Sequence, residues 1–141
     1  MMQLVKDFFH LKRYDMKKWL LTTLLGLIAV GTAQAENWRL IYDHDDGQYF
    51  IDDTSLDKTQ HKARFKLIPK EGPLSGYFYI ILTEEVDCAK KQYQILHYDV
   101  YQLSGTLTES ADAPPNAWLP SIPNTSGEQG VKAICGQPTE N

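Results

Sequence analysis

Residues 77–86, YFYIILTEEV, have the strongest β-strand tendency in the chain, because nearly all of them are aromatic or branched. The middle of the segment is apolar at consecutive positions, so both faces of a strand formed there would carry apolar side chains. This pattern predicts a central strand of a sheet, covered on each side.

A hairpin is predicted on the N-terminal side of this strand. Residues 37–42 (NWRLIY) and 48–52 (QYFID) are apolar, aromatic-containing runs, and residues 43–47 (DHDDG) between them have turn composition. The turn contains carboxylates and an imidazole. However, Gly47 is its fifth residue and Thr54 would be its twelfth, which does not fit a calcium loop of the EF-hand type. We therefore expect a solvated turn and no metal site.

Polar and apolar residues alternate along residues 61–68, which predicts another strand. Its apolar face carries Ala63, Phe65 and Leu67. Its opposite face carries the basic stripe, which we define as Lys62, Arg64 and Lys66. The stripe is the candidate partner-binding site, for an acidic protein patch, a heparin-like glycan or anionic headgroups. The alternative is a solvated face paired with acidic side chains of neighbouring strands.

Strand character continues through residues 92–103, and Ser104-Gly105 turns the chain towards residues 106–110. The connections are too short for parallel crossovers, which need about a dozen residues, so the five or six strands should be antiparallel. His97 and Asp99 share one face of the long strand. We expect them to form polar contacts between strands rather than a catalytic pair.

The C-terminal part predicts a loop followed by a short helix. Residues 111–124 contain four prolines and should be irregular. Residues 125–129 offer two overlapping capping-box frames, one beginning at Thr125 and one at Ser126. Apolar residues follow at helical spacing as far as Cys135-Gly136. The predicted fold class is α+β, mainly β, with an antiparallel sheet of about five or six strands and this helix.

The N-terminal part predicts export. Residues 16–35 combine two lysines, an apolar run and an Ala-Gln-Ala exit, as a cleaved signal peptide does. Residues 1–15 resemble an upstream extension, and cleavage before Glu36 would leave a single domain, residues 36–141. The apolar run is shorter than the roughly 20 residues of a membrane span, and no cysteine follows it for lipid attachment. We expect a periplasmic or secreted protein.

Charge and cysteine content limit what such a domain can do. Loss of residues 1–35 removes five of 14 basic and two of 18 acidic residues, which leaves a net charge of −7 and argues against nucleic-acid binding. The two cysteines, Cys88 and Cys135, predict a disulfide in an oxidising compartment. It would tether the helix to the sheet by closing a loop of about 48 residues, which is worth roughly 4 kcal/mol.

Nothing in the sequence predicts an enzyme. The serines lie in no G-x-S-x-G motif, and neither a glycine-rich phosphate loop nor an H-E-x-x-H motif is present. We therefore expect no catalytic residues and no cofactor. The dense aromatic residues fit either a binding surface or a small β core.

Several short motifs, taken in order, resemble one family. They are Asn37-Trp38-Arg39-Leu40-Ile41, Tyr49-Phe50-Ile51-Asp52, Ser55-Leu56, Val86-Asp87-Cys88, Tyr98-Asp99 with Gly105, Trp118, Ile122-Pro123-Asn124-Thr125 and Ile134-Cys135. Over nearly all of residues 36–136 the chain resembles the surface-adhesin protein E family of Gram-negative bacteria. The resemblance implies a sheet of about six antiparallel strands with a tethered C-terminal helix.

The same resemblance implies adhesion, with an extracellular-matrix or envelope protein as partner, and an ability to form a homodimer. The type member of the family is a lipoprotein, and residues 33–36 of this chain (AQAE) contain no cysteine to lipidate. We therefore expect an exported, non-enzymatic binding module. The alternative is a periplasmic structural, regulatory or inhibitor-type protein with an endogenous partner and no adhesive role.

Overall fold

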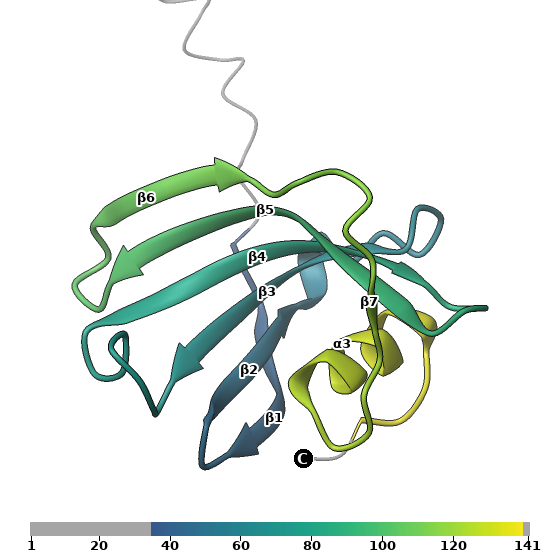
Figure 1. The fold of residues 1–141 in the computed structure, drawn as a ribbon, viewed down its shortest axis with the longest axis horizontal. Helices are drawn as coiled ribbons and strands as arrows, with labels where there is room; N and C mark the ends of the chain where they lie inside the picture. Colours follow the sequence, from purple (N-terminus) through teal and green to yellow (C-terminus); the bar gives the residue numbers. More distant parts are fainter. Residues whose placement is uncertain (1–34, 140–141) are drawn as a thin grey trace, which may run out of the picture. The chain divides into compact units, whose positions relative to one another are not determined.

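The structure, a computed structural model, describes residues 35–139. The predicted extension and nearly all of the predicted signal peptide lie outside these residues. One antiparallel sheet contains β1 (Trp38–His44), β2 (Gly47–Asp52), β3 (Lys62–Pro69), β4 (Phe78–Asp87), β5 (Gln92–Gln102), β6 (Leu107–Asp112) and the short β7 (Leu119–Pro120). Strands β1 to β6 follow one another in the sheet in chain order, while β7 pairs with β5 (Figure 1). The predicted fold class is confirmed.

The central position predicted for residues 77–86 is confirmed, because β4 pairs with β3 on one side and β5 on the other. The expectation of cover on each side is only half met. Within residues 35–139, helix α3 (Ser126–Cys135) packs against one face of the sheet only, as Figure 1 shows. On the other face Ile81 is still only 5% exposed, so the middle of β4 is shielded there too.

The hydrophobic core lies between the sheet and α3. Tyr49 and Phe65 stack on neighbouring strands with ring centroids 5.0 Å apart, and Val131 and Ile134 of α3 close over them. Ile41, Tyr42, Ile51, Ala63 and Val86 complete the buried cluster. We call this surface of the sheet the helix-covered face and the opposite surface the open face.

Local sequence sets both ends of α3. Thr125 is the N-cap, and its hydroxyl accepts a hydrogen bond from the backbone N–H of Glu128 at 3.4 Å, which selects the first of the two predicted frames. Gly136 ends the helix in the left-handed region, with a φ of 75°. The helix therefore has the position and the end that the sequence predicts.

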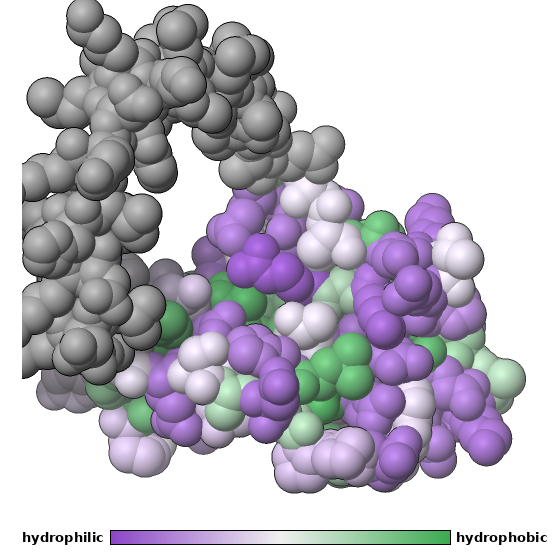
Figure 2. Space-filling view, turned by 90° about the horizontal axis from the view of Figure 1, so that it is seen from above, coloured by the Kyte–Doolittle hydropathy of each residue, from purple (hydrophilic) through white to green (hydrophobic). Residues whose placement is uncertain are grey.

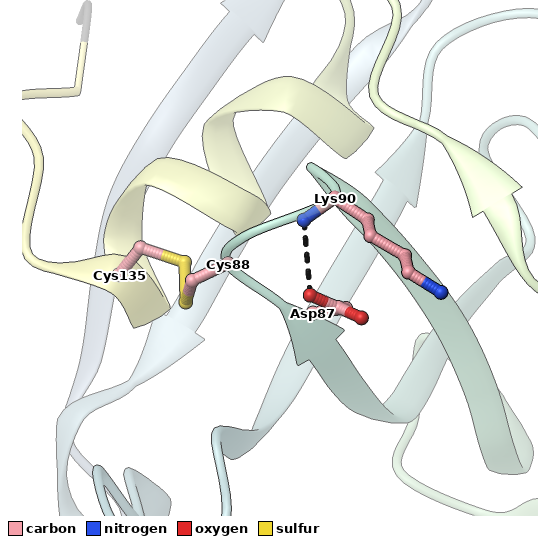
Figure 3. Close-up of a disulfide and its surroundings, with 4 residues drawn as sticks. All are labelled: Asp87, Cys88, Lys90 and Cys135. Carbon is pink, nitrogen blue, oxygen red and sulfur yellow. Dashed lines mark hydrogen bonds between the residues drawn. A yellow bond between two sulfur atoms is a disulfide. The ribbon is translucent and has the colours of Figure 1, made fainter.

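A disulfide fastens this helix to the sheet. Cys88 follows β4 and Cys135 is the last residue of α3, and their Cα atoms lie 5.8 Å apart (Figure 3). Beside the bridge, the Asp87 carboxylate accepts a hydrogen bond from the backbone N–H of Lys90 at 3.0 Å, which holds the turn that follows β4. The predicted Cys88–Cys135 pairing is confirmed.

Candidate functional site

The basic stripe lies on the open face. Directly paired residues of antiparallel strands share a face, and Lys66 pairs with Phe50 of β2 and Ile81 of β4. The alternation predicted for residues 61–68 is therefore correct, with Phe65 buried on the helix-covered face and Lys62, Arg64 and Lys66 on the other. The three basic side chains differ in their surroundings, however.

Arg64 is engaged by two carboxylates. Its Nη1 lies 2.9 Å from Oε1 of Glu36 and 3.8 Å from Oδ2 of Asp52. The other oxygen of the Glu36 carboxylate, Oε2, accepts a hydrogen bond from the indole Nε1 of Trp38 at 3.0 Å. Trp38 of β1 and Arg64 of β3 thus both donate to the carboxylate of Glu36, which precedes β1.

Asp52 is the fixed counter-ion of this arrangement. It is 2% exposed and caps the short 3₁₀ helix Asp53–Ser55 (η3). Burial opposes its ionisation, but hydrogen bonds from the Thr54 side chain and from the backbone N–H groups of Asn37 and Thr54 outweigh burial and hold its pKa below the ordinary value. The carboxylate of Asp52 thus both caps η3 and lies beside Arg64.

Lys66 lies among aromatic rings instead of carboxylates. Its Nζ is 4.7 Å from the ring centroid of Trp38, 5.4 Å from that of Phe50 and 5.9 Å from that of Tyr79. Such contacts between an ammonium group and ring faces are attractive. Tyr79 in turn stacks on Tyr101 with centroids 5.1 Å apart. Lys66 therefore contacts aromatic rings from three other strands, β1, β2 and β4.

These residues form one cluster that crosses the open face from β1 to β5. We define the aromatic–basic cluster as Trp38, Phe50, Arg64, Lys66, Tyr79 and Tyr101. The sequence predicts its basic members, but it does not show that the aromatic residues gather around Lys66. That grouping depends on strand register, which also includes a bulge in β1 between Leu40 and Tyr42.

A second polar group joins β5 to β6. His97 Nδ1 lies 2.7 Å from Asp112 Oδ1, and its Nε2 lies 3.0 Å from Asp99 Oδ1. Hydrogen bonds to Asp112 and Asp99 raise the pKa of His97. The hydroxyl of Ser110 donates to Asp99, and its oxygen also lies 3.1 Å from Nε2 of His97. The cluster is a polar brace between strands, as expected for His97 and Asp99.

A buried carboxyl on the helix-covered face was not singled out from the sequence. Glu84 of β4 is 2% exposed and accepts a hydrogen bond from the hydroxyl of Tyr49 through Oε1. Burial raises its pKa to about 7. No hydrogen bond reaches its Oε2 from the described part of the chain. The side chain lies beneath Gly130 of α3, away from the open face.

Other candidate sites are weaker. The turn is shorter than the predicted residues 43–47, because Asp43 and His44 belong to β1 and Gly47 to β2. Asp43 pairs with Lys70, and Asp46 accepts a hydrogen bond from the hydroxyl of Tyr42. Within residues 35–139, no group of three acidic, histidine or cysteine residues is arranged to hold a metal ion. A cavity of about 270 Å³ lies beside the disulfide, and an ion pair between Glu128 and Lys132 occupies its wall.

Figure 2 shows the surface of the molecule seen from above relative to Figure 1. On the described residues visible there, hydrophobic side chains lie in small groups among hydrophilic ones. A partner that binds such a surface must match polar as well as apolar groups.

In a comparison with protein-family models, residues 38–136 match the model described as Surface-adhesin protein E. The chain belongs to the surface-adhesin protein E family. Comparisons with curated proteins and with solved structures give no significant match. The match covers every strand of the sheet and all of α3, so the region that the family model matches coincides with the fold described above.

Membership of the protein E family supports a surface-adhesin-like protein that is exposed at the cell surface or secreted and binds another protein. It also favours a binding role over an enzymatic one. In residues 35–139, none of the helices has the length and hydropathy required to cross a bilayer.

Proposed function

We propose that this protein E family member is an exported, non-enzymatic binding module that contacts another protein through the open face of its sheet. The observation that carries the proposal is the aromatic–basic cluster on the face that α3 leaves uncovered. Trp, Tyr and Arg are the residues that most often dominate binding energy at protein interfaces. The cluster contains all three types, on rigid strands.

The cluster is also ordered before any partner arrives. Stacking of Tyr79 on Tyr101 and the contacts of Lys66 restrict side chains that would otherwise lose rotamer freedom on binding. Restricting them in the free protein lowers the entropic cost of association. The restricted side chains favour the open face, rather than the loops, as the binding surface.

Photo-crosslinking in living cells tests the proposal. A photoreactive amino acid replaces Tyr101 on the open face, and a matched variant carries it at Lys91, in the exposed turn between β4 and β5. We expect a protein adduct from position 101 and little from position 91. Adducts from position 91 alone, or none from either position, would contradict the proposal.

The alternative is a periplasmic structural, regulatory or inhibitor-type protein with an endogenous partner. It is favoured by the absence of a lipidation cysteine in residues 33–36. Protease treatment of intact cells separates the two functions, because a displayed adhesin is digested and a periplasmic protein is spared. The open face is the proposed contact surface in both cases.

A further inference from the structure

We propose that Arg64 and Trp38 form a carboxylate-binding site, which Glu36 fills in the free protein and an acidic side chain of a bound protein segment fills in the complex. The inference rests on the proposed function, because it specifies the chemistry of the partner on the same open face.

The geometry is that of a carboxylate receptor. Arg64 Nη1 donates to one oxygen of Glu36 at 2.9 Å, and Trp38 Nε1 donates to the other at 3.0 Å. Hydrogen bonds to an ionised acceptor are stronger than those between neutral groups. Because the two donors belong to different strands, the site recognises the position and orientation of a carboxylate as well as its charge.

The donors are held by residues other than Glu36. Asp52 lies 3.8 Å from the Arg64 guanidinium and is itself fixed by hydrogen bonds from Asn37 and Thr54. The ring of Trp38 has the ammonium group of Lys66 over it at 4.7 Å. Departure of Glu36 would therefore leave the two donors in place, ready for another carboxylate.

Glu36 itself is easily displaced. Its side chain is 48% exposed and that of Arg64 is 36% exposed, and ion pairs with this much solvent contact are weak. It also precedes β1, so the sheet does not depend on its position. A carboxylate delivered by a partner with further contacts on the cluster would compete successfully with it.

The donors of Arg64 and Trp38 favour an acidic segment. Without the Glu36 side chain, Arg64 would keep Asp52 at 3.8 Å as its ion-pair partner. Lys62 lies opposite Glu85 across β3 and β4. A hydrogen bond from Ser110 and, to a lesser extent, the charge of Arg64 lower the pKa of Asp99. Rings on either side of Lys66 offer apolar contact next to these donors. A peptide with an acidic residue beside apolar ones matches both features, so we infer an acidic protein segment rather than a glycan.

The test measures binding of a fluorescein-labelled oligoglutamate peptide to the full chain by fluorescence anisotropy. Glu36→Gln removes the competing charge, and Glu71→Gln, in the exposed β3–β4 loop, is the control that changes net charge equally. We expect Glu36→Gln to tighten binding about two- to fivefold, the strength of a surface ion pair, and Glu71→Gln to have a much smaller effect. Adding Arg64→Gln to Glu36→Gln should abolish the gain. Thermal unfolding of each variant checks that it is folded.

A ¹H–¹⁵N NMR spectrum provides a second measurement of carboxylate binding. The indole N–H signal of Trp38, assigned by its loss in Trp38→Phe, should shift when oligoglutamate is added to Glu36→Gln. Equal effects of the two glutamine variants, or an unmoved indole signal, would overturn the inference. Binding of a heparin fragment without binding of oligoglutamate would overturn it as well.

These results are separable from those that test the proposed function. Suppose that cross-linking at position 101 succeeds while Glu36→Gln binds oligoglutamate no better than Glu71→Gln. The proposed carboxylate site is then contradicted, and the open face is retained as the binding surface. If Glu36→Gln binds oligoglutamate more tightly as expected but no adduct forms at position 101, the carboxylate site is retained and the proposed function is contradicted.

Discussion

Two adjacent glutamates of β4 have very different surroundings. Glu84 and Glu85 point to opposite faces, and Glu84 is 2% exposed whereas Glu85 shares a hydrogen bond with Gln94 on the open face. The raised pKa of Glu84 follows from burial, which disfavours its charged form. The residue therefore links the stability of the sheet–helix core to pH.

Glu84→Gln should remove a pH dependence of stability. The pKa of Glu84 rises from 4.5 to about 7 on folding, so between these values the folded state binds more protons than the unfolded state. The contribution of Glu84 to stability should be fully present below pH 4.5 and fall by about 3 kcal/mol as pH rises through 7. The glutamine variant, which cannot ionise, should lose most of this fall. Urea unfolding at pH 5 and pH 8, without reductant, measures it.

Glu85→Gln is the control for that experiment, because it makes the same substitution at the neighbouring position, on the open face. His97 acts in the same direction as Glu84, because its raised pKa means that stability is lost as pH rises above its ordinary value of 6.5, but this contribution remains in both variants. An unchanged fall in Glu84→Gln would show that the buried carboxyl does not titrate as described.

For single residues, the sequence predicts which face of a strand a side chain occupies, but not which residues of other strands become its neighbours. Alternation is a local pattern, so it correctly places Lys62, Arg64 and Lys66 on one face. The rings around Lys66 come from three other strands, and no local pattern specifies which residues become neighbours. Glu84 is harder still, because a bulge between Thr83 and Glu84 shifts the pairing with β5 at that point.

At the scale of elements, α3 depends on close contact with the sheet. Two of its glycines are buried and face it. A Cβ added to Gly127 would lie 2.7 Å from the Tyr93 ring, whereas a Cβ added to Gly130 would lie 3.5 Å from its nearest neighbours, in Glu84 and Phe65. The first glycine therefore allows close approach, and the second has room for a methyl group.

Gly127→Ala and Gly130→Ala should change stability in opposite directions. The first forces the half-buried Tyr93 ring to move and should cost about 1–2 kcal/mol. The second makes ordinary contacts and replaces a poor helix former, so it should stabilise by up to about 1 kcal/mol. Urea midpoints of the two variants measure the difference. Equal shifts of one sign would contradict the close approach at Gly127.

The disulfide should be the main support of α3. Replacing both Cys88 and Cys135 by serine avoids a free thiol, and should destabilise the protein by roughly 2–5 kcal/mol. Because a helix of 10 residues is marginal by itself, its amides should lose protection before those of β4. Hydrogen exchange followed by mass spectrometry measures this order. Simultaneous loss of protection in α3 and β4 would contradict it.

Elements proved easier to predict than sites. The sequence predicts five or six strands and the helix, because their side-chain periods and caps are encoded within each segment, as at Thr125 and Gly136. The strand β7 was missed, since residues 119–120 lie in a proline-rich stretch and pair with β5 only through tertiary contact. Local sequence contains no signal for such a pairing.

At the scale of the whole molecule, cleavage of the predicted signal peptide would alter the proposed carboxylate site. Cleavage before Glu36, as the sequence predicts, would make the residue that fills the Arg64–Trp38 site the first of the mature chain. The new α-ammonium group would then lie beside the Glu36 carboxylate on the open face. Processing and binding would be connected through a single residue.

Intact-mass measurement of the exported protein tests this processing. We expect a mass that begins at Glu36 and lacks two hydrogens, in agreement with the bridge between Cys88 and Cys135. A mass that retains residues 16–35, or one that includes a lipid, would contradict the predicted leader.

The disulfide between Cys88 and Cys135 also affects resistance to proteolysis. Cys88 and Cys135 enclose β5, β6, β7 and the loop at residues 113–118 in one covalent ring. A single cut in that loop opens the ring without releasing a fragment, and β6 and β7 on either side of the cut both remain paired with β5. Nicked molecules would therefore remain whole and folded until a reductant reached them, so the exposed loop need not limit the lifetime of the protein.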